Sequence, residues 1–247
     1  MKINGDYHTH TLFSHGVGRI EENVLAAIEK GFEVIAIAEH SYGHLTFGVK
    51  RDKLYQIKEE IDELNQKYPQ IQIKFGLEAN ILNVEGDIDV DEELLRSLDF
   101  VMAGYHFGSV PKKVFRDTWH HVSNLLSKWI PGLRKACTKR NTVAMVNAMK
   151  RYPLFAVTHP GAKGPIDIDR VAQTAFEEGI LLEINAHHGH LSVEEIRRAK
   201  AKHARFIINS DAHDPRHVGR VDKGIARAVE AGLTEDDVFN VNRLKKN

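Results

Sequence analysis

Residues 6–15 read Asp-Tyr-His-Thr-His-Thr-Leu-Phe-Ser-His, and the rest of the chain can be arranged around this stretch. If residues 4–10 form a strand, side chains alternate between its faces, so His8 and His10 point to the same side. That arrangement aims two imidazole nitrogens at one metal ion, and His15 follows in the next loop. A His-x-His pair also occurs as two solvated histidines. The metal interpretation therefore depends on further ligands from elsewhere in the chain.

The composition is that of an ordinary globular protein, with 247 residues of which 42% are hydrophobic and 28% charged. Mean hydropathy is −0.35. Lys plus Arg equals Asp plus Glu at 34, which argues against a surface coated for nucleic acid but leaves a local basic patch open. The one cysteine, Cys137, excludes an internal disulfide framework and is typical of a reducing cytoplasm. With no signal peptide and no apolar run of about 18 residues, we expect a cytoplasmic protein without a membrane partner.

The hydrophobic pattern alternates between strands and helices along most of the chain. Helical spacing of apolar residues predicts helices over 20–30, 52–68, 92–98, 142–151, 168–178, 192–203 and 220–231, with a last short helix near residue 234. Buried apolar runs predict strands over 4–10, 32–38, 71–77, 100–105, 154–158, 180–184 and 206–209. Seven strand–helix units indicate one domain with a parallel sheet, as a closed barrel or an open doubly wound sheet.

Residues 107–139 interrupt this rhythm. The segment mixes aromatic and basic side chains, namely Phe107, Phe115, Trp119, Trp129, Lys112, Lys113, Arg116, Lys128, Arg134 and Lys135. We interpret it as an inserted helical segment near the strand ends. A lid over the site and a solvated helical excursion packed on the barrel wall explain it equally well.

Residues of the types that bind transition metals follow the predicted strands. In a parallel barrel the carboxyl ends of the strands converge on one face, where active sites are built. Such residues stand at six of the seven strand ends, which a set of structural core histidines does not explain. The predicted ligands are His8, His10, His15, His40, Glu78, His106, His159, Asp211 and His213.

These motifs resemble the PHP (polymerase and histidinol phosphatase) family. The matching stretches are 6–10 with Ser14-His15, Ala38-Glu39-His40, 76–80, Gly104-Tyr105-His106, 158–161 and 209–213. They follow the family's order over nearly the whole chain. The resemblance implies a distorted (β/α)7 barrel of the TIM type, so we expect residues 1–247 to form a single PHP domain. Glu39 stands where the family usually has Asp, and we expect it to orient His40.

The resemblance also implies a trinuclear site. One ion would be held by His8, His10, Glu78 and Asp211. A second would take Glu78, His106 and His159, and a third His15, His40 and His213. Glu78 would bridge the first two ions, because a carboxylate has two oxygens and a neutral imidazole offers one free nitrogen. For the three divalent ions that the resemblance implies, many imidazoles with few carboxylates favour transition metals, Zn, Mn or Fe, over Mg or Ca.

Such a cluster supplies hydroxide at neutral pH and neutralises phosphate oxygens. We therefore expect a phosphatase that hydrolyses a small phosphomonoester by in-line attack of a metal-bridging hydroxide, with histidinol phosphate as one family substrate. Glu78, His106 and Asp211 would be catalytic through the metals. A phosphate dianion also requires Arg or Lys, and the candidates near strand ends are Arg19, Lys163 and Arg216, with Arg216 favoured. We interpret His187, His188 and His190 as solvated loop histidines, with protonation of the leaving group as the alternative.

Three other functions stay open at this point. The first is a phosphodiesterase or exonuclease acting on nucleotides or short nucleic acid, which the basic and aromatic insertion would serve by stacking and charge. The second is a non-catalytic metal-binding module, although the ligand set is complete. The third is an amidohydrolase-type barrel, which typically has eight strands and a carboxylated lysine. Neither feature is predicted here.

Overall fold

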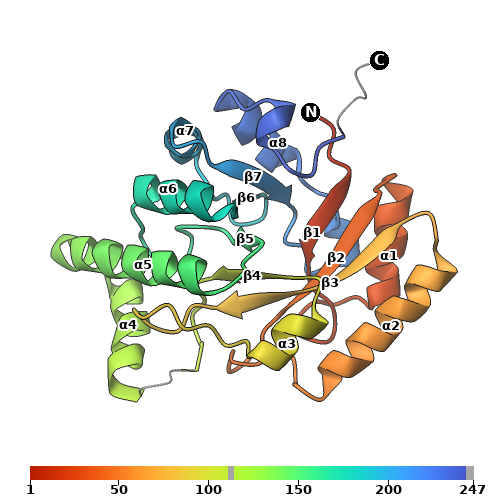
Figure 1. The fold of residues 1–247 in the computed structure, drawn as a ribbon, viewed down its shortest axis with the longest axis horizontal. Coiled ribbons are helices and arrows are strands. Elements are labelled where there is room, and N and C mark those ends of the chain that lie inside the picture. Colours follow the sequence, from red (N-terminus) through yellow and green to blue (C-terminus); the bar gives the residue numbers. More distant parts are fainter. Residues whose placement is uncertain (111–113, 243–247) are drawn as a thin grey trace.

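The computed structural model describes residues 1–110 and 114–242, and its framework is a seven-stranded parallel sheet (Figure 1). The strands lie in chain order, each paired with the next. Their bounds are β1 Gly5–Thr9, β2 Val34–His40, β3 Gln72–Asn80, β4 Phe100–Gly104, β5 Ala156–Val157, β6 Leu181–Asn185 and β7 Arg205–Asn209. The sheet curls into a nearly closed barrel, which confirms the predicted fold class and decides against the open doubly wound sheet.

Helices connect successive strands. Their bounds are α1 Ile20–Glu29, α2 Lys53–Lys67, α3 Glu92–Ser97, α4 Val114–Leu126, α5 Pro131–Arg151, α6 Ile168–Glu178, α7 Val193–Ala201 and α8 Asp222–Glu230. Their ends follow capping rules. Ser192 and Glu195 form the predicted capping box of α7, and α6 ends at Gly179 with φ +69°, the left-handed cap that glycine adopts without strain. No helix in the described ranges is both long and apolar enough to cross a membrane.

One helix begins earlier in the chain than predicted. The helix expected over 142–151 is the second half of α5, which begins at Pro131 and runs for 21 residues. Proline at the first helical position favours this start, and the first half faces largely to solvent, so it lacks the apolar spacing that marked the second half. The last short helix is a 3₁₀ turn, Glu235–Asp237. Lys112 and Lys113 lie outside the described residues, as do the side chains of Phe115 and Arg116.

Strand alternation separates an outer core from the barrel interior. Along β2, Ile35 and Ile37 pack outward against helices, whereas Ala36 and Ala38 face inward. The next inward position is His40, which lines a cavity at the carboxyl end of the barrel. By the same alternation of side chains, Glu78 in β3 also faces inward. Apolar residues therefore fill the bottom of the barrel, and polar residues occupy its top.

Side chains, rather than a continuous strand ladder, close the barrel between β1 and β7. One parallel bridge joins Thr9 to Ala212. Near it, the buried Asp6 carboxylate accepts hydrogen bonds from the backbone N–H of Ser210 at 3.1 Å and of Gly219 at 2.9 Å. At the other end of the seam, Asn240 donates from Nδ2 to the carbonyls of Gly5 and Ile208, each at 2.7 Å. Its Oδ1 accepts from the Ile208 N–H at 3.1 Å.

This seam gives a stability prediction. Asn240→Ala removes three hydrogen bonds and leaves buried backbone groups of β1 and β7 unsatisfied, so we expect the free energy of unfolding to fall by about 3 kcal/mol in urea denaturation. The matched control is Asn242→Ala, since the Asn242 side chain makes no hydrogen bond within the described residues, and its effect should stay below about 0.5 kcal/mol. Equal losses in both variants would contradict the role given to Asn240.

Candidate metal centre

All nine predicted ligands lie together at the carboxyl end of the barrel. Seven of them line one cavity of about 470 Å³, namely His15, His40, Glu78, His106, His159, Asp211 and His213. His8 and His10 lie fully buried beside them. His8 belongs to β1, and His10 is the first residue after that strand. Ligands from six strands therefore converge as the barrel topology predicts.

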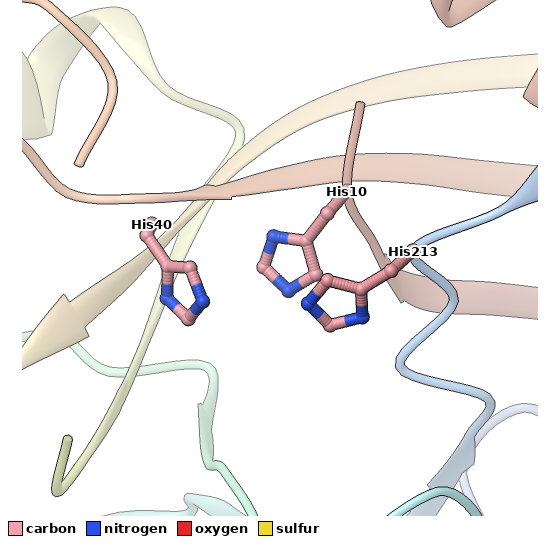
Figure 2. Close-up of side chains that lie close together, drawn as sticks. All are labelled: His10, His40 and His213. Atoms are coloured by element: carbon pink, nitrogen blue, oxygen red, sulfur yellow. The ribbon is translucent and has the colours of Figure 1, made fainter. Parts of the chain in front are cut away.

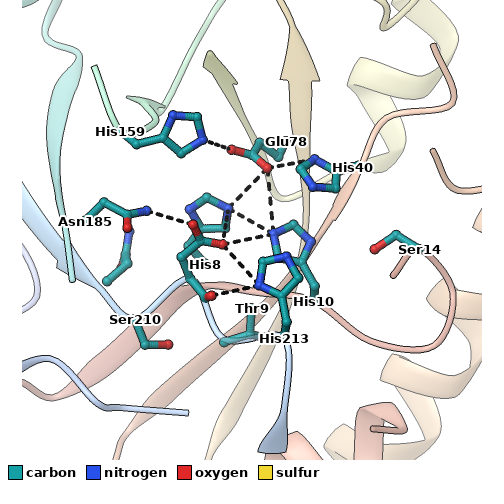
Figure 3. Close-up of polar contacts among 12 residues, drawn as sticks. His8, Thr9, His10, Ser14, His40, Glu78, His159, Asn185, Ser210 and His213 are labelled. Carbon is teal, nitrogen blue, oxygen red and sulfur yellow. Dashed lines mark hydrogen bonds and ion pairs between the residues drawn. The ribbon is translucent and has the colours of Figure 1, made fainter. Parts of the chain in front are cut away.

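Glu78 lies at the middle of this group (Figure 3). Its Oε2 lies 3.3 Å from Nε2 of His8 and 2.9 Å from Nδ1 of His40. Its Oε1 lies 3.1 Å from Nε2 of His106 and 2.9 Å from Nε2 of His159. The two oxygens of one carboxylate thus face two different sets of imidazoles.

Asp211 completes the set around His8 and His10. Its Oδ1 lies 3.6 Å from Nε2 of His8 and 3.4 Å from Nε2 of His10, and the two Nε2 atoms are 3.1 Å apart. A tetrahedral ion with ligands about 2.0–2.2 Å away separates pairs of ligands by roughly 3.3–3.6 Å. The distances in this set are therefore close to those of side chains that share one ion.

The third predicted set is less regular. The ring centroid of His15 lies 4.1 Å from that of His213 and 4.8 Å from that of His40. The ligand atoms that come within 4.8 Å of one another, however, belong to His10, His40 and His213 (Figure 2). His15 is thus adjacent to the predicted partners, while His10 is the nearer donor.

Several buried donor and acceptor atoms in the cluster lack a hydrogen-bond partner in the described chain. They are Nδ1 of His10, His15 and His106, and Oδ1 of Asp211. Buried polar atoms are rarely left unsatisfied in a native protein. Oδ1 of Asp211 lies near Nε2 of both His8 and His10, and a carboxylate oxygen beside two imidazole nitrogens fits a divalent transition metal.

The charges of the cluster favour the metal-binding forms of most of its members. Burial alone would raise the pKa of Glu78, but the imidazoles of His106, His8 and His40 hold that pKa well below its usual range. Burial lowers the pKa of His106 to about 3 and that of His213 to about 2. These groups are therefore a carboxylate and neutral imidazoles at neutral pH. His8 and His10 differ. Burial lowers the pKa of both, but the carboxylates of Glu78, Glu183 and Asp211 raise the pKa of His8 well above its usual range. The carboxylates of Asp211 and Glu39 raise that of His10 to about 9, so a bound metal would displace a proton from each.

The backbone is bent where two ligands leave their strands. His159 and Asp211 have φ values of +27° and +55°, in a region that residues other than glycine rarely adopt. Each follows the end of a strand, where the turn directs its side chain into the cluster. Such conformations persist where the surroundings fix them, and they gather at functional sites.

The sequence analysis missed Glu183, a buried carboxylate in β6. Its Oε1 accepts from Nδ1 of His8 at 2.7 Å, and its Oε2 accepts from the His159 N–H at 2.7 Å. Asn185 and Asn209 also donate to it, at 3.0 and 2.9 Å. By binding Nδ1 of His8, Glu183 leaves Nε2 free to face the metal position. One acidic residue inside an apolar strand was the signal that could have found it.

Glu39 has a different partner from the one predicted. Its carboxylate contacts the hydroxyls of Thr11 and Ser14, accepts from the Thr11 N–H at 2.9 Å, and lies 3.8 Å from Nδ1 of His10. Adjacent residues in a strand point to opposite faces, so Glu39 cannot follow His40 into the cavity. The prediction that Glu39 orients His40 was wrong, because it supports His10 and the following loop.

The loop after β6 brings in another histidine. His188 lines the cavity, and its Nε2 lies 3.5 Å from Oδ2 of Asp211. With His159 and Asp211 it forms a further group of ligand-type atoms. The interpretation of His188 as a solvated loop residue was wrong, since it is half-buried and faces the cluster. His187 is exposed at the cavity wall.

The three predicted phosphate-binding cations lie in different places. Lys163 lines the cavity. Arg19 lines a separate depression beside α1. Arg216, the favoured candidate, is exposed and bonds to Asp214 through Nε at 3.0 Å. Asp214 caps the short turn Pro215–His217, and this local pairing holds the guanidinium away from the cavity.

Comparison with known proteins agrees with this geometry. A family model described as "PHP domain" matches residues 6–187. A probable phosphatase of Thermoanaerobacter sp. (strain X514) is 31% identical over 264 residues, covering 100% of this chain and 94% of the relative. The DNA polymerase/3'-5' exonuclease PolX of Bacillus subtilis (strain 168) is 28% identical over 99% of this chain and 40% of its own length. Among solved structures, histidinol phosphate phosphatase from Lactococcus lactis, complexed with Zn, L-histidinol and phosphate, superposes with a TM-score of 0.66, 17% identity and 95% coverage of both chains.

The contacts of Glu183 predict an effect on metal affinity. Glu183→Gln replaces one acceptor oxygen by a donor amide, so it cannot satisfy the four donors that surround it. We expect the dissociation constant for Zn²⁺, measured by competition with a chromogenic chelator, to rise 10- to 100-fold. Glu178→Gln, on the exposed end of α6, is the control that should leave it unchanged. An unaltered affinity in Glu183→Gln would show that the carboxylate serves only the fold.

Proposed function

The chain belongs to the PHP domain family of metal-dependent phosphoesterases, and we propose that it hydrolyses a small phosphomonoester with three divalent metal ions. The observation that carries this proposal is the position of Glu78, whose two oxygens lie within 3.3 Å of imidazoles from two different sets at the base of one cavity. We further propose that residues 1–247 form one PHP domain, with 107–139 as an insertion. In support, β7 completes the barrel beyond the matched residues 6–187.

We assign the ligands as the family resemblance implies. His8, His10, Glu78 and Asp211 would hold the first ion. Glu78, His106 and His159 would hold the second. His15, His40 and His213 would hold the third, with His10 as a nearby alternative donor. The short distances within the first two sets support this division, and so does the unpartnered Nδ1 of His15.

Bound divalent ions lower the pKa of coordinated water and neutralise phosphate charge. The chain's own residues provide the remaining requirements. Glu78, His106 and Asp211 act through the ions that they hold, and Glu183 fixes the tautomer of His8. The Lys163 ammonium lines the cavity, where it would attract and orient a phosphate dianion.

The shape of the cavity favours a small substrate. Its volume of about 470 Å³ is within the usual range for small-molecule sites. Val17, Phe47 and Phe107 form apolar parts of its wall, so the group that carries the phosphate would contact hydrocarbon and aromatic surface. The relative from Lactococcus lactis binds Zn, L-histidinol and phosphate, which supports zinc and a substrate of this size.

Hydrolysis of phosphodiesters is the second candidate function. The similarity to PolX favours it, although this chain covers only 40% of that protein. The insertion also presents exposed Arg134 and Lys135 together with Trp119 and Trp129. These residues lie outside the cavity lining, so they support binding of a longer substrate only indirectly.

A metal-reconstitution experiment tests the proposed function. After chelation and reloading with Zn²⁺ or Mn²⁺, we expect phosphate release from small monoesters and at least 100-fold slower cleavage of diesters and oligonucleotides. Glu78→Gln should lose two of three bound ions by elemental analysis and at least 100-fold in kcat/KM, because an amide cannot bridge two cations. Faster cleavage of diesters would establish the second candidate. Three ions retained in Glu78→Gln would refute the bridging role.

The positions of the cations predict which one binds phosphate. Lys163→Ala removes a positive charge from the cavity, so we expect KM for a monoester to rise about tenfold, with a smaller change in the bound metal content. Arg216→Ala removes a guanidinium that already pairs with Asp214. If steady-state kinetics show the larger effect in Arg216→Ala or Arg19→Ala, the phosphate site lies elsewhere than at Lys163.

A further inference from the structure

The apolar side of helix α4 faces solvent. A row of large side chains on α4 and the turn after it faces solvent, and we name it the tryptophan face: Trp119, Val122, Leu125, Leu126, Trp129 and Ile130. Trp119 and Trp129 are 53% and 70% exposed. The helix lies against α5 at the edge of the molecule, away from the barrel (Figure 1). Within α4, Trp119, Val122 and Leu126 are three and four residues apart, which is the spacing of a single helix face.

The opposite side of α4 is polar and buried. Ser123, Asn124 and Ser127 are almost completely buried. Asn124 Oδ1 accepts from Nδ2 of Asn141 at 2.8 Å, and Ser123 Oγ accepts from Arg140 Nη2 at 2.6 Å. The amphipathic pattern of an ordinary surface helix is thus reversed, because its polar residues face the protein. The buried polar contacts fix this orientation, so the helix cannot rotate to bury its apolar side.

We propose that the tryptophan face is the interface with a second copy of this chain, with the two α4 helices packed against each other across a two-fold axis. The largest apolar patch on a monomeric protein is typically about 300–600 Å² and is often functional. The six side chains expose on the order of 600 Å² per copy, so pairing two copies buries about 1,200 Å², the lower limit for a specific interface. Aromatic and aliphatic side chains without charge are also the composition of an interface core.

The six residues of the patch carry no charge, whereas basic residues occur in the sequence on both sides of it. Lys112, Lys113 and Arg116 stand before or at the start of α4, and Lys128, Arg134 and Lys135 follow its carboxyl end. Charge therefore does not select between parallel and antiparallel packing of the two helices. The row of aliphatic side chains favours this partner over nucleic acid, because Leu125 and Leu126 offer no surface for base stacking.

The sequence provides an internal probe for this proposal. Trp119 and Trp129 are the only tryptophans of the chain, so intrinsic fluorescence of the unmodified protein reports on this patch alone. We expect a dimer by sedimentation velocity at micromolar concentration. On dilution, tryptophan emission should shift to longer wavelength at the same concentration at which the dimer dissociates.

The variant Leu125→Lys keeps both tryptophans and should raise the dissociation constant of the dimer at least 100-fold. Its thermal unfolding midpoint should equal that of the wild type when both proteins are measured as monomers. Val229→Lys, on an equally exposed apolar residue of α8, should leave the dimer intact. If Leu125→Lys does not fold, the dilution series of the wild type decides alone. A monomer at 100 µM, or a dimer whose emission does not change on dissociation, would overturn the proposal. So would a monomer whose emission shifts to shorter wavelength with phosphatidylserine vesicles or an oligonucleotide, since either identifies another partner.

Discussion

Burial of negative charge at the top of the barrel is the constraint on which this structure depends. Glu78, Glu183 and Asp211 are almost fully buried within one cluster, and a buried carboxylate is costly unless cations or hydrogen bonds compensate for it. Imidazoles surround Glu78, and four donors surround Glu183. Binding of additional positive charge would therefore improve the electrostatic balance of these ligand residues. The carboxylates whose burial is costly are thus the residues that would attract divalent ions.

Much of this arrangement follows from the period of the strands. The inward positions of β2 run from Ala36 and Ala38 to His40, so small apolar residues lie below the ligand. Glu78 occupies the corresponding level in β3, paired with His40 in the parallel register. The sequence pattern was sufficient to predict a parallel sheet, its strand ends and the nine ligand-type residues that meet there, because each of these depends on local spacing and on one topological rule. The choice of a barrel over an open sheet came from the family resemblance, since local spacing is the same in both.

Other features depended on contacts that spacing does not encode. Glu183 lies inside an apolar strand, and only the closure of the barrel brings it to His8. Glu39 was assigned to the neighbouring His40, although the two side chains leave β2 on opposite faces. Arg216 is near the site in sequence but pairs with Asp214 two residues away. The start of α5 was missed because its first half makes few core contacts, so no apolar period marks it. In each case the deciding interaction is either very local or very distant in sequence.

The seam between β1 and β7 also governs when the site comes into existence. Asp6 and Ser210 are separated by 204 positions, and His8 and Asp211 lie next to them. During synthesis on the ribosome, the early ligands emerge long before the strand that completes their set. A nascent chain thus presents His8 and His10 before Asp211, whose Oδ1 lies 3.6 and 3.4 Å from their Nε2 atoms in the folded protein. The proposed site is therefore complete only after the last strand has left the ribosome.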